Sequence, residues 1–129
     1  MKVTGYAWAG VGTDDFERTL RFFTDVLGLR VQLEGDNVAH LAVGPRQLLE
    51  IFGGDHPGRA LNATPTIAFE VDDFDSARQE LVAAGVELVG DVGQWNGHEW
   101  QYFRSPDGHL FEIKKMPAEP SRAQSSSSS

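Results

Sequence analysis

The sequence contains an internal repeat. The stretch 9–17 returns as 67–75, and in both copies an apolar run enters the residues Asp-Asp-Phe followed by an acidic residue. A helical pattern that ends at a glycine follows each copy. A second pair of similar segments, 49–52 and 111–114, comes later in each copy. Two copies of one unit are too few for a solenoid, so we expect them to pack into one domain.

The composition narrows the class of protein. A chain of 129 residues fits one domain, and 40% hydrophobic residues are enough to build its core. The formal net charge of −8 argues against nucleic acid or an anionic membrane surface as a partner. The absence of cysteine excludes disulfides, thiolate metal sites and a cysteine nucleophile. No apolar segment has the length of a signal-peptide core or a membrane span, so we expect a cytoplasmic protein.

The first copy is predicted to form a strand, a helix and three further strands, because apolar alternation and helical spacing follow one another between turn-rich segments. The predicted elements are a strand over 6–13, a helix over 16–27 and strands over 30–33, 38–43 and 47–52. Asp14 is predicted to cap the helix, with Glu17 completing a capping box. Gly28 is predicted to end the helix in a left-handed conformation.

The second copy repeats this order. Its predicted elements are a strand over 66–71, a helix over 74–84 and strands over 87–89, 99–104 and 109–114. Asp72 and Asp75 are predicted to cap the helix. The segment Ser-Pro-Asp-Gly before the last strand is typical of a type I turn followed by a glycine bulge.

These elements define one domain over residues 1–116. Its first module spans 1–53 and its second spans 64–116, with a linker rich in Gly and Pro over 54–63. Residues 117–129 show no apolar periodicity and end in a run of serines, which predicts a disordered Ser-rich tail.

Two signatures carry a family resemblance. Residues 15–29, DFERTLRFFTDVLGL, resemble the D-L-E-x-S-x-x-F-Y-x-x-V-L-G-L signature of the vicinal oxygen chelate superfamily, and residues 103–112, FRSPDGHLFE, resemble its F-x-D-P-D-G-N-x-x-E signature. This superfamily includes glyoxalase I, extradiol dioxygenases, and fosfomycin- and bleomycin-resistance proteins. The resemblance implies an α+β fold in which two tandem βαβββ modules form curved mixed sheets around a cavity. It also implies a homodimer, and leaves open whether the cavity lies within one chain or between two.

The resemblance further implies where a metal would be held. Metal-binding members place ligands, commonly two histidines and one or two glutamates, on the first and last strand of each module. In this chain those positions are Trp8, Glu50, Thr66 and Glu112. Both histidines are lost, since tryptophan cannot bind a metal and a neutral threonine hydroxyl is a poor ligand. We therefore expect no cofactor, with Glu50 and Glu112 as weak candidates for holding a hard divalent cation.

Among the histidines, His40 is the one predicted to face the cavity. Strand alternation makes it a candidate cross-strand neighbour of Glu50, and a purely structural role is the alternative. His56 in the linker and His109 beside a turn are expected to be solvated, while His98 begins a strand.

Aromatic side chains take the place of the missing metal ligands. Alternation puts several of them on the predicted cavity face around the two glutamates. The predicted ligand-binding residues are Tyr6, Trp8, Phe52, Thr66, Trp100 and Tyr102. Trp95 is predicted to form a lip of the cavity. Any one of these aromatic residues has a structural alternative, because β-strands favour aromatics for packing alone.

Three functions compete. The first, which we favour, is the binding and sequestration of a planar aromatic or cationic, antibiotic-like small molecule, as the resemblance to bleomycin-resistance proteins implies. The second is a metal-free lyase or isomerase in which Glu50 or Glu112 is the catalytic acid or base, with Tyr102 or His40 as an auxiliary donor. The third is a metal-dependent enzyme similar to glyoxalase or the dioxygenases, which needs ligands that the chain lacks.

Overall fold

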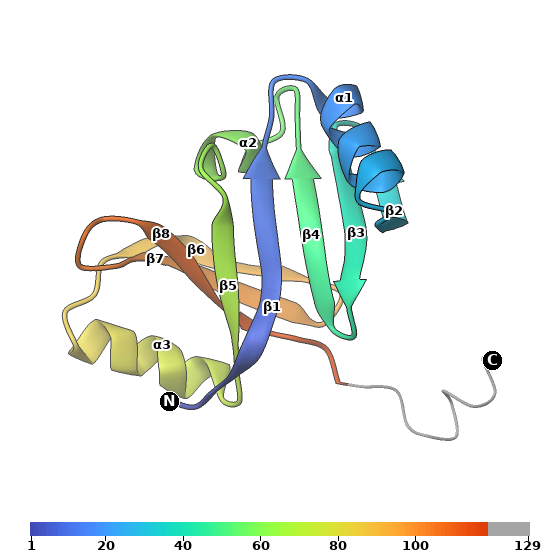
Figure 1. Ribbon diagram of the computed structural model, residues 1–129. Coiled ribbons are helices and arrows are strands. Elements are labelled where there is room, and N and C mark those ends of the chain that lie inside the picture. Colours follow the sequence, from blue (N-terminus) through green and yellow to red (C-terminus); the bar gives the residue numbers. More distant parts are fainter. Residues whose placement is uncertain (119–129) are drawn as a thin grey trace, which may run out of the picture.

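A single curled β-sheet forms the framework of the protein. The computed structural model describes residues 1–118 (Figure 1). The strands are β1 (Val3–Gly12), β2 (Arg30–Gly35), β3 (Val38–Gly44), β4 (Gln47–Phe52), β5 (Thr66–Val71), β6 (Leu88–Trp95), β7 (His98–Arg104) and β8 (Leu110–Lys115). The helices are α1 (Phe16–Arg21), its π-helical continuation η1 (Phe22–Val26), α2 (Gly58–Leu61) and α3 (Phe74–Ala83).

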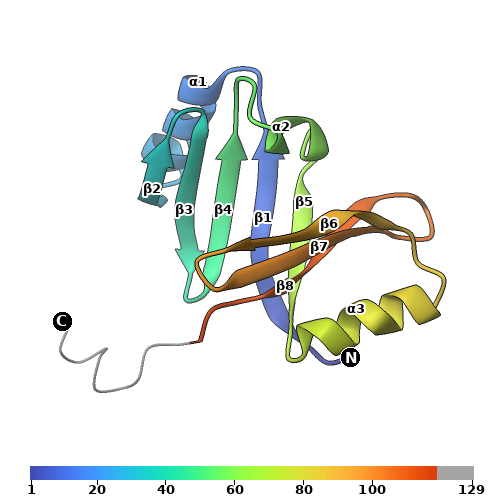
Figure 2. The ribbon, with the colours of Figure 1, turned by 180° about the vertical axis from the view of Figure 1, so that it is seen from behind.

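The two repeats are joined edge to edge. The strand order is β2-β3-β4-β1-β5-β8-β7-β6, and β1 pairs with β5 in antiparallel orientation. Within each repeat the first and last strands pair in parallel, β1 with β4 and β5 with β8. The sheet curls so that β6, β7 and β8 cross behind β1 and β5 in the view of Figure 1 and in front of them in Figure 2. The predicted α+β class, with two βαβββ repeats in curved mixed sheets, is confirmed.

Each repeat packs its helix against the convex side of its own strands. Phe16 and Leu20 of α1 lie in one buried cluster with strand residues such as Leu41 and Ile51, both fully buried. In the second repeat, α3 contributes Phe74, Ala77 and Leu81 to an equivalent cluster with Ile113. Full burial of one such aliphatic or aromatic side chain stabilises the fold by about 1.5–3 kcal/mol. The helices therefore cover the convex face of the sheet and leave its concave face uncovered.

The helix caps lie one residue later than predicted. Asp15, rather than Asp14, caps α1 by accepting a hydrogen bond from Arg18 N, at 3.2 Å. Asp73, rather than Asp72, caps α3 by accepting one from Ser76 N, at 3.1 Å. Because each cap is one residue later, neither Glu17 nor Asp75 stands three residues after its cap. No capping box forms at either helix.

Three further elements differ from the prediction by more than a small shift of a boundary. The first helix is α-helical only to Arg21 and then widens to a π-helix, beside which Thr24 donates its hydroxyl to Leu20 O. Its end at Gly28, with φ of 75°, is as predicted. The linker contains the short helix α2, and β6 continues to Trp95 because it pairs with β7 over most of its length.

The described residues bear on the predicted tail only in small part, and they also show whether a helix could cross a membrane. Nearly all of the predicted Ser-rich tail, 117–129, lies outside the described residues. None of the helices within residues 1–118 is both long and apolar enough to cross a membrane.

Candidate functional site

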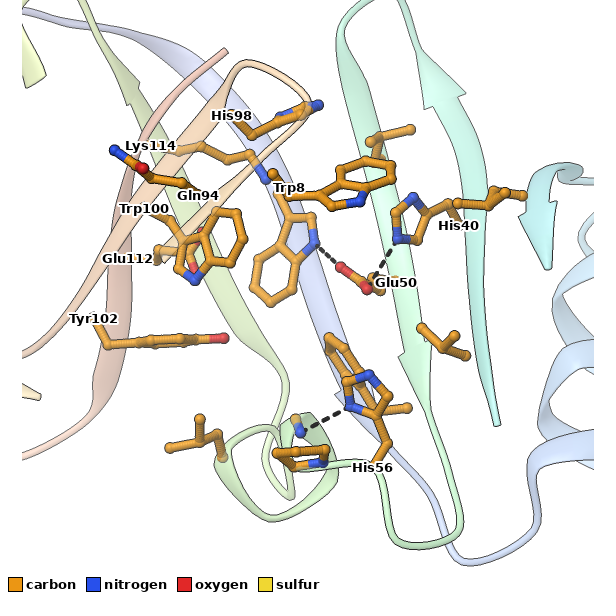
Figure 3. Close-up of a pocket in the computed structure, with 18 residues that line it drawn as sticks. Trp8, His40, Glu50, His56, Gln94, His98, Trp100, Tyr102, Glu112 and Lys114 are labelled. Atoms are coloured by element: carbon orange, nitrogen blue, oxygen red, sulfur yellow. Dashed lines mark hydrogen bonds and ion pairs between the residues drawn. The ribbon is translucent and has the colours of Figure 1, made fainter. Parts of the chain in front are cut away.

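A cavity of about 530 Å³ lies on the concave face of the sheet. Its lining residues come from both repeats of one chain. The lining consists of Trp8, Leu33, Val38, His40, Leu48, Glu50, Phe52, His56, Pro57, Gly58, Leu61, Gln94, Trp95, His98, Trp100, Tyr102, Glu112 and Lys114. Figure 3 shows the labelled side chains converging from the two halves of the sheet.

Tryptophans shape the middle of the cavity. The Trp8 side chain is 5% exposed and lies over Gly10, where a Cβ atom would collide with its ring. The Trp100 ring lies over Gly93 in the same way. Each glycine therefore makes room for a flat ring against the sheet. Figure 3 shows Trp8 between Trp100 on one side and Glu50 on the other.

Glu50 is engaged by two neighbours. Trp8 donates its indole N–H to Glu50 Oε1 at 2.9 Å, and His40 Nε2 lies 2.9 Å from Oε2. His40 is paired directly across the strands with Glu50, as predicted. Burial acts to raise the pKa of Glu50, but the hydrogen bond and charge of His40, the Trp8 hydrogen bond and the charge of Lys114 outweigh it. The net effect lowers the pKa of Glu50 and stabilises its ionised carboxylate.

Glu112 is in the opposite situation. Its side chain is 2% exposed, and burial raises its pKa to about 8, although the Lys114 charge and a hydrogen bond with Tyr102 oppose the rise. Tyr102 is paired across the strands with Glu112. Burial and the neighbouring Glu112 charge also raise the pKa of the Tyr102 hydroxyl. At neutral pH this corner therefore holds a protonated carboxyl group beside a phenol.

Lys114 is a cavity residue that the sequence analysis missed. It is 6% exposed, and its Nζ lies 5.7 Å from the Trp8 ring centroid and 5.4 Å from that of Trp100. Burial lowers its pKa, against the opposing charges of Glu112 and Glu50. The signal was available, since Lys114 stands two residues after Glu112 on one strand face and matches Phe52 in the repeat.

Two histidines also line the cavity contrary to expectation. His56 packs against the Phe52 ring at 4.9 Å and accepts a hydrogen bond from Gly58 N, because α2 folds the linker back over the cavity. His98 stacks on Trp95 at 5.8 Å. Burial and the nearby positive charges of Lys114 and His40 lower the pKa of His98 to about 4, so it is neutral at neutral pH. His109 is exposed, as predicted.

Two predicted ligand-binding residues lie outside the cavity lining. Tyr6 is 60% exposed and packs on Phe69 at 5.5 Å, on the other face of the sheet. A β-bulge between Tyr6 and Trp8 reverses the alternation on which the prediction rested. Thr66 is buried, and its hydroxyl donates a long hydrogen bond of 3.5 Å to Thr64 O. It pairs with Gly10, which the Trp8 ring covers.

The donor set does not fit a metal centre. Within residues 1–118, no group of three or more His, Cys, Asp or Glu side chains is arranged to hold a metal ion. Both oxygens of Glu50 already have partners, and the Lys114 charge acts on both glutamates. A divalent cation at the superfamily's position would displace the Trp8 hydrogen bond and meet an ammonium group.

Comparison with known proteins agrees with the fold. Residues 5–113 match the family described as Glyoxalase/Bleomycin resistance protein/Dioxygenase superfamily. The chain belongs to this superfamily. The predicted resemblance to the vicinal oxygen chelate proteins is thereby confirmed, and it spans both repeats.

Individual relatives carry several different activities. The chain is 31% identical over 104 residues to metallothiol transferase FosB from Lysinibacillus sphaericus, covering 77% of this chain and 73% of the relative. It is 27% identical to 2-epi-5-epi-valiolone epimerase from an Actinomyces species, covering 81% and 75%. Methylmalonyl-CoA epimerase from Mycobacterium tuberculosis has the same fold, with a TM-score of 0.68 and 23% identity over 95% of this chain and 93% of that one.

A fourth similar protein is known with a bound metal. The Mn(II)-bound glyoxalase from Novosphingobium aromaticivorans has a TM-score of 0.68 and 25% identity, covering 94% of this chain and 43% of that one. The superfamily thus combines this scaffold with metal sites in some members, whereas the donor set of the present chain departs from such a site.

Proposed function

We propose that the protein binds a planar small molecule in its aromatic cavity without the help of a metal ion. The observation that carries this proposal is the hydrogen bond from Trp8 to Glu50. It joins two positions at which metal-binding relatives carry ligands. The bond occupies a carboxylate oxygen that a metal would need, and it brings an indole face into the cavity.

The cavity suits such a ligand in size and lining. Its volume of about 530 Å³ is in the range of sites for small organic molecules. Trp8, Trp95, Trp100 and Tyr102 offer ring faces or edges from both halves of the sheet. Each aromatic pair contributes about 0.5–1.5 kcal/mol beyond area burial. The size and aromatic lining of the cavity support sequestration of an antibiotic-like compound.

The homodimer and the cytoplasmic location stay predictions.

The binding proposal is tested with tryptophan fluorescence and thermal unfolding. A planar probe such as naphthalene-2-carboxamide is expected to quench the fluorescence and to raise the melting temperature, equally with and without EDTA. Trp100→Ala should weaken binding about tenfold, whereas Trp100→Phe should keep most of the affinity because a ring face remains. Binding that disappears on chelation would contradict the proposal.

A second candidate is a metal-free acid–base enzyme, which the buried Glu112–Tyr102 pair favours. A carboxyl group with a pKa of about 8 is close to the value that suits proton transfer near neutral pH. Glu50 provides another carboxylate from the opposite repeat. Two relatives are named epimerases, enzymes whose chemistry inverts a stereocentre.

Product analysis separates the two candidates. The protein is incubated with ligands that it binds, and chiral chromatography with mass spectrometry detects any change. A binding protein returns each ligand unaltered. Conversion that Glu112→Gln abolishes without loss of affinity would make the protein an enzyme.

A further inference from the structure

Lys114 places a positive charge in the wall of the cavity. It lies on β8, two residues after Glu112, and its side chain is almost fully buried. Figure 3 shows the side chain running from β8 toward Trp8, above the space between Trp8 and Trp100. Its ammonium group therefore points into the cavity, over two indole rings, rather than to solvent.

The ammonium group makes no hydrogen bond or close ion pair with any residue of the part of the chain that the structure describes. It lies over the two indole faces and is attracted through space by the ionised Glu50 carboxylate. An ammonium group carries three N–H donors, and a buried charge without hydrogen bonds is unfavourable. Cation–π contacts of about 0.5–2 kcal/mol each offset only part of this cost.

The other ionisable groups of the cavity are neutral or already have hydrogen-bonding partners. Glu50 accepts from Trp8 and is paired with His40. Glu112 is 2% exposed and has Tyr102 as its neighbour across the strands. His98 is neutral, and His56 accepts from a backbone N–H. An incoming ligand therefore meets Lys114 as the charged group with open hydrogen-bonding capacity.

We infer that the ligand is a planar aromatic carboxylate, and that Lys114 binds its carboxylate oxygens while its ring contacts Trp8 and Trp100. This inference rests on the proposed function and names the ligand class of the same cavity. It differs from the cationic ligand that the sequence analysis gives as one alternative, because the group with open donors at the cavity wall is positive. Lys114 then supplies, as a side chain, the positive charge that a metal supplies in other members.

Three probes of equal ring size test the charge preference on the full chain. They are naphthalene-2-carboxylate, naphthalene-2-carboxamide and 2-naphthylmethylammonium, and tryptophan fluorescence gives their dissociation constants. The carboxylate is expected to bind about tenfold more tightly than the amide, because a charge-assisted hydrogen bond is stronger than a neutral one. The ammonium probe is expected to bind most weakly, since it meets Lys114 as a like charge.

Variants then assign the preference to one residue. Lys114→Met keeps the length and removes the charge, so it should lower the affinity for the carboxylate to that for the amide and leave the amide unchanged. Lys114→Arg should retain most of the preference. Lys115→Met is the matched control, because Lys115 is the next residue of β8 and its side chain is exposed near Glu99. It should leave all three dissociation constants unchanged.

The outcomes separate this inference from the proposed function. Equal affinity for carboxylate and amide, or tightest binding of the ammonium probe, would overturn the inference and leave planar-ligand binding standing. A carboxylate preference that persists in Lys114→Met would also overturn it. Failure of all three probes to bind would overturn both. If Lys114→Met does not fold, the ranking of the probes on the parent protein and Lys114→Arg decides.

Discussion

Glu50 and Glu112 stand at equivalent positions of the two repeats, yet their surroundings give them opposite acidities. Glu50 has two hydrogen-bonding neighbours, Trp8 and His40, and its pKa is lowered. Glu112 is more deeply buried, and its pKa rises to about 8. The same residue type on the same strand of a duplicated unit thus stores a charge in one half and a proton in the other. The difference arises from the hydrogen-bond donors that reach Glu50 and from the deeper burial of Glu112.

The largest expected effect comes from removing the residue that holds Glu50. Trp8→Ala deletes a buried indole and leaves Glu50 short of a donor, so the free energy of unfolding should fall by about 3–5 kcal/mol. Urea unfolding measures this loss. Trp95→Ala, at an exposed tryptophan of the same cavity, is the control and should cost far less. Equal losses in the two variants would mean that Trp8 does not pack as described.

Exchanging each glutamate for glutamine tests the comparison directly. Glu50→Gln removes a charge that His40 faces, and should destabilise the protein by about 1–3 kcal/mol. Glu112→Gln replaces a protonated carboxyl by a neutral group of the same shape, so at pH 6 it should cost under about 1 kcal/mol. Chemical unfolding of both variants at one pH gives the two values. A larger loss for Glu112→Gln would reverse the assignment.

The pH dependence of stability should have opposite signs at the two sites. In the unfolded chain Glu112 titrates near 4.5, and in the folded chain near 8. Between these values the unfolded chain releases the proton first, so the Glu112 contribution to stability falls as pH rises. Glu50, with its lowered pKa, contributes stability above 4.5 that is lost as pH falls through its folded value.

The Glu112 effect is isolated by comparing the unfolding free energies of the parent and of Glu112→Gln between pH 5 and pH 8. Other groups titrate alike in both proteins. The free energy of unfolding of Glu112→Gln should increase steadily relative to that of the parent as pH rises. A constant difference over this range would show that Glu112 has an ordinary pKa.

The smallest effects concern the helix caps, which the two repeats share. Asp73→Ala removes the side chain that accepts from Ser76 N and should cost about 1 kcal/mol. Asp72→Ala, at the neighbouring aspartate, should cost less than about 0.5 kcal/mol. Thermal unfolding compares the two variants. A greater loss in Asp72→Ala would restore the cap predicted from the sequence.

Much of the site was predictable because strand alternation is local. The strands Gln47–Phe52 and Thr66–Val71 have the predicted limits, and Glu50, Phe52, Trp100, Tyr102 and Glu112 line the cavity as predicted. Alternation failed for Tyr6, because a single extra residue between Tyr6 and Trp8 in β1 puts these two side chains on opposite faces of the sheet. Such a bulge leaves no reliable mark in the residues themselves.

The cavity's electrostatics were beyond local patterns. Contacts between strands far apart in the chain decide which donors reach Glu50 and how deeply Glu112 is buried. They also decide where the Lys114 ammonium group lies. His56 lines the cavity because α2 folds the linker, which the sequence pattern marks only as rich in Gly and Pro.

The sequence by itself determined the duplicated βαβββ unit, the superfamily and the absence of histidine at positions 8 and 66, because these depend on residue order and periodicity. Only the tertiary structure decided that residues of both repeats line one cavity. It alone decided that Trp8 takes up Glu50, and that Lys114 brings a cation to the cavity wall. Side-chain partners and desolvation are set by the packing of distant strands, and they turn two equivalent glutamates into unlike groups.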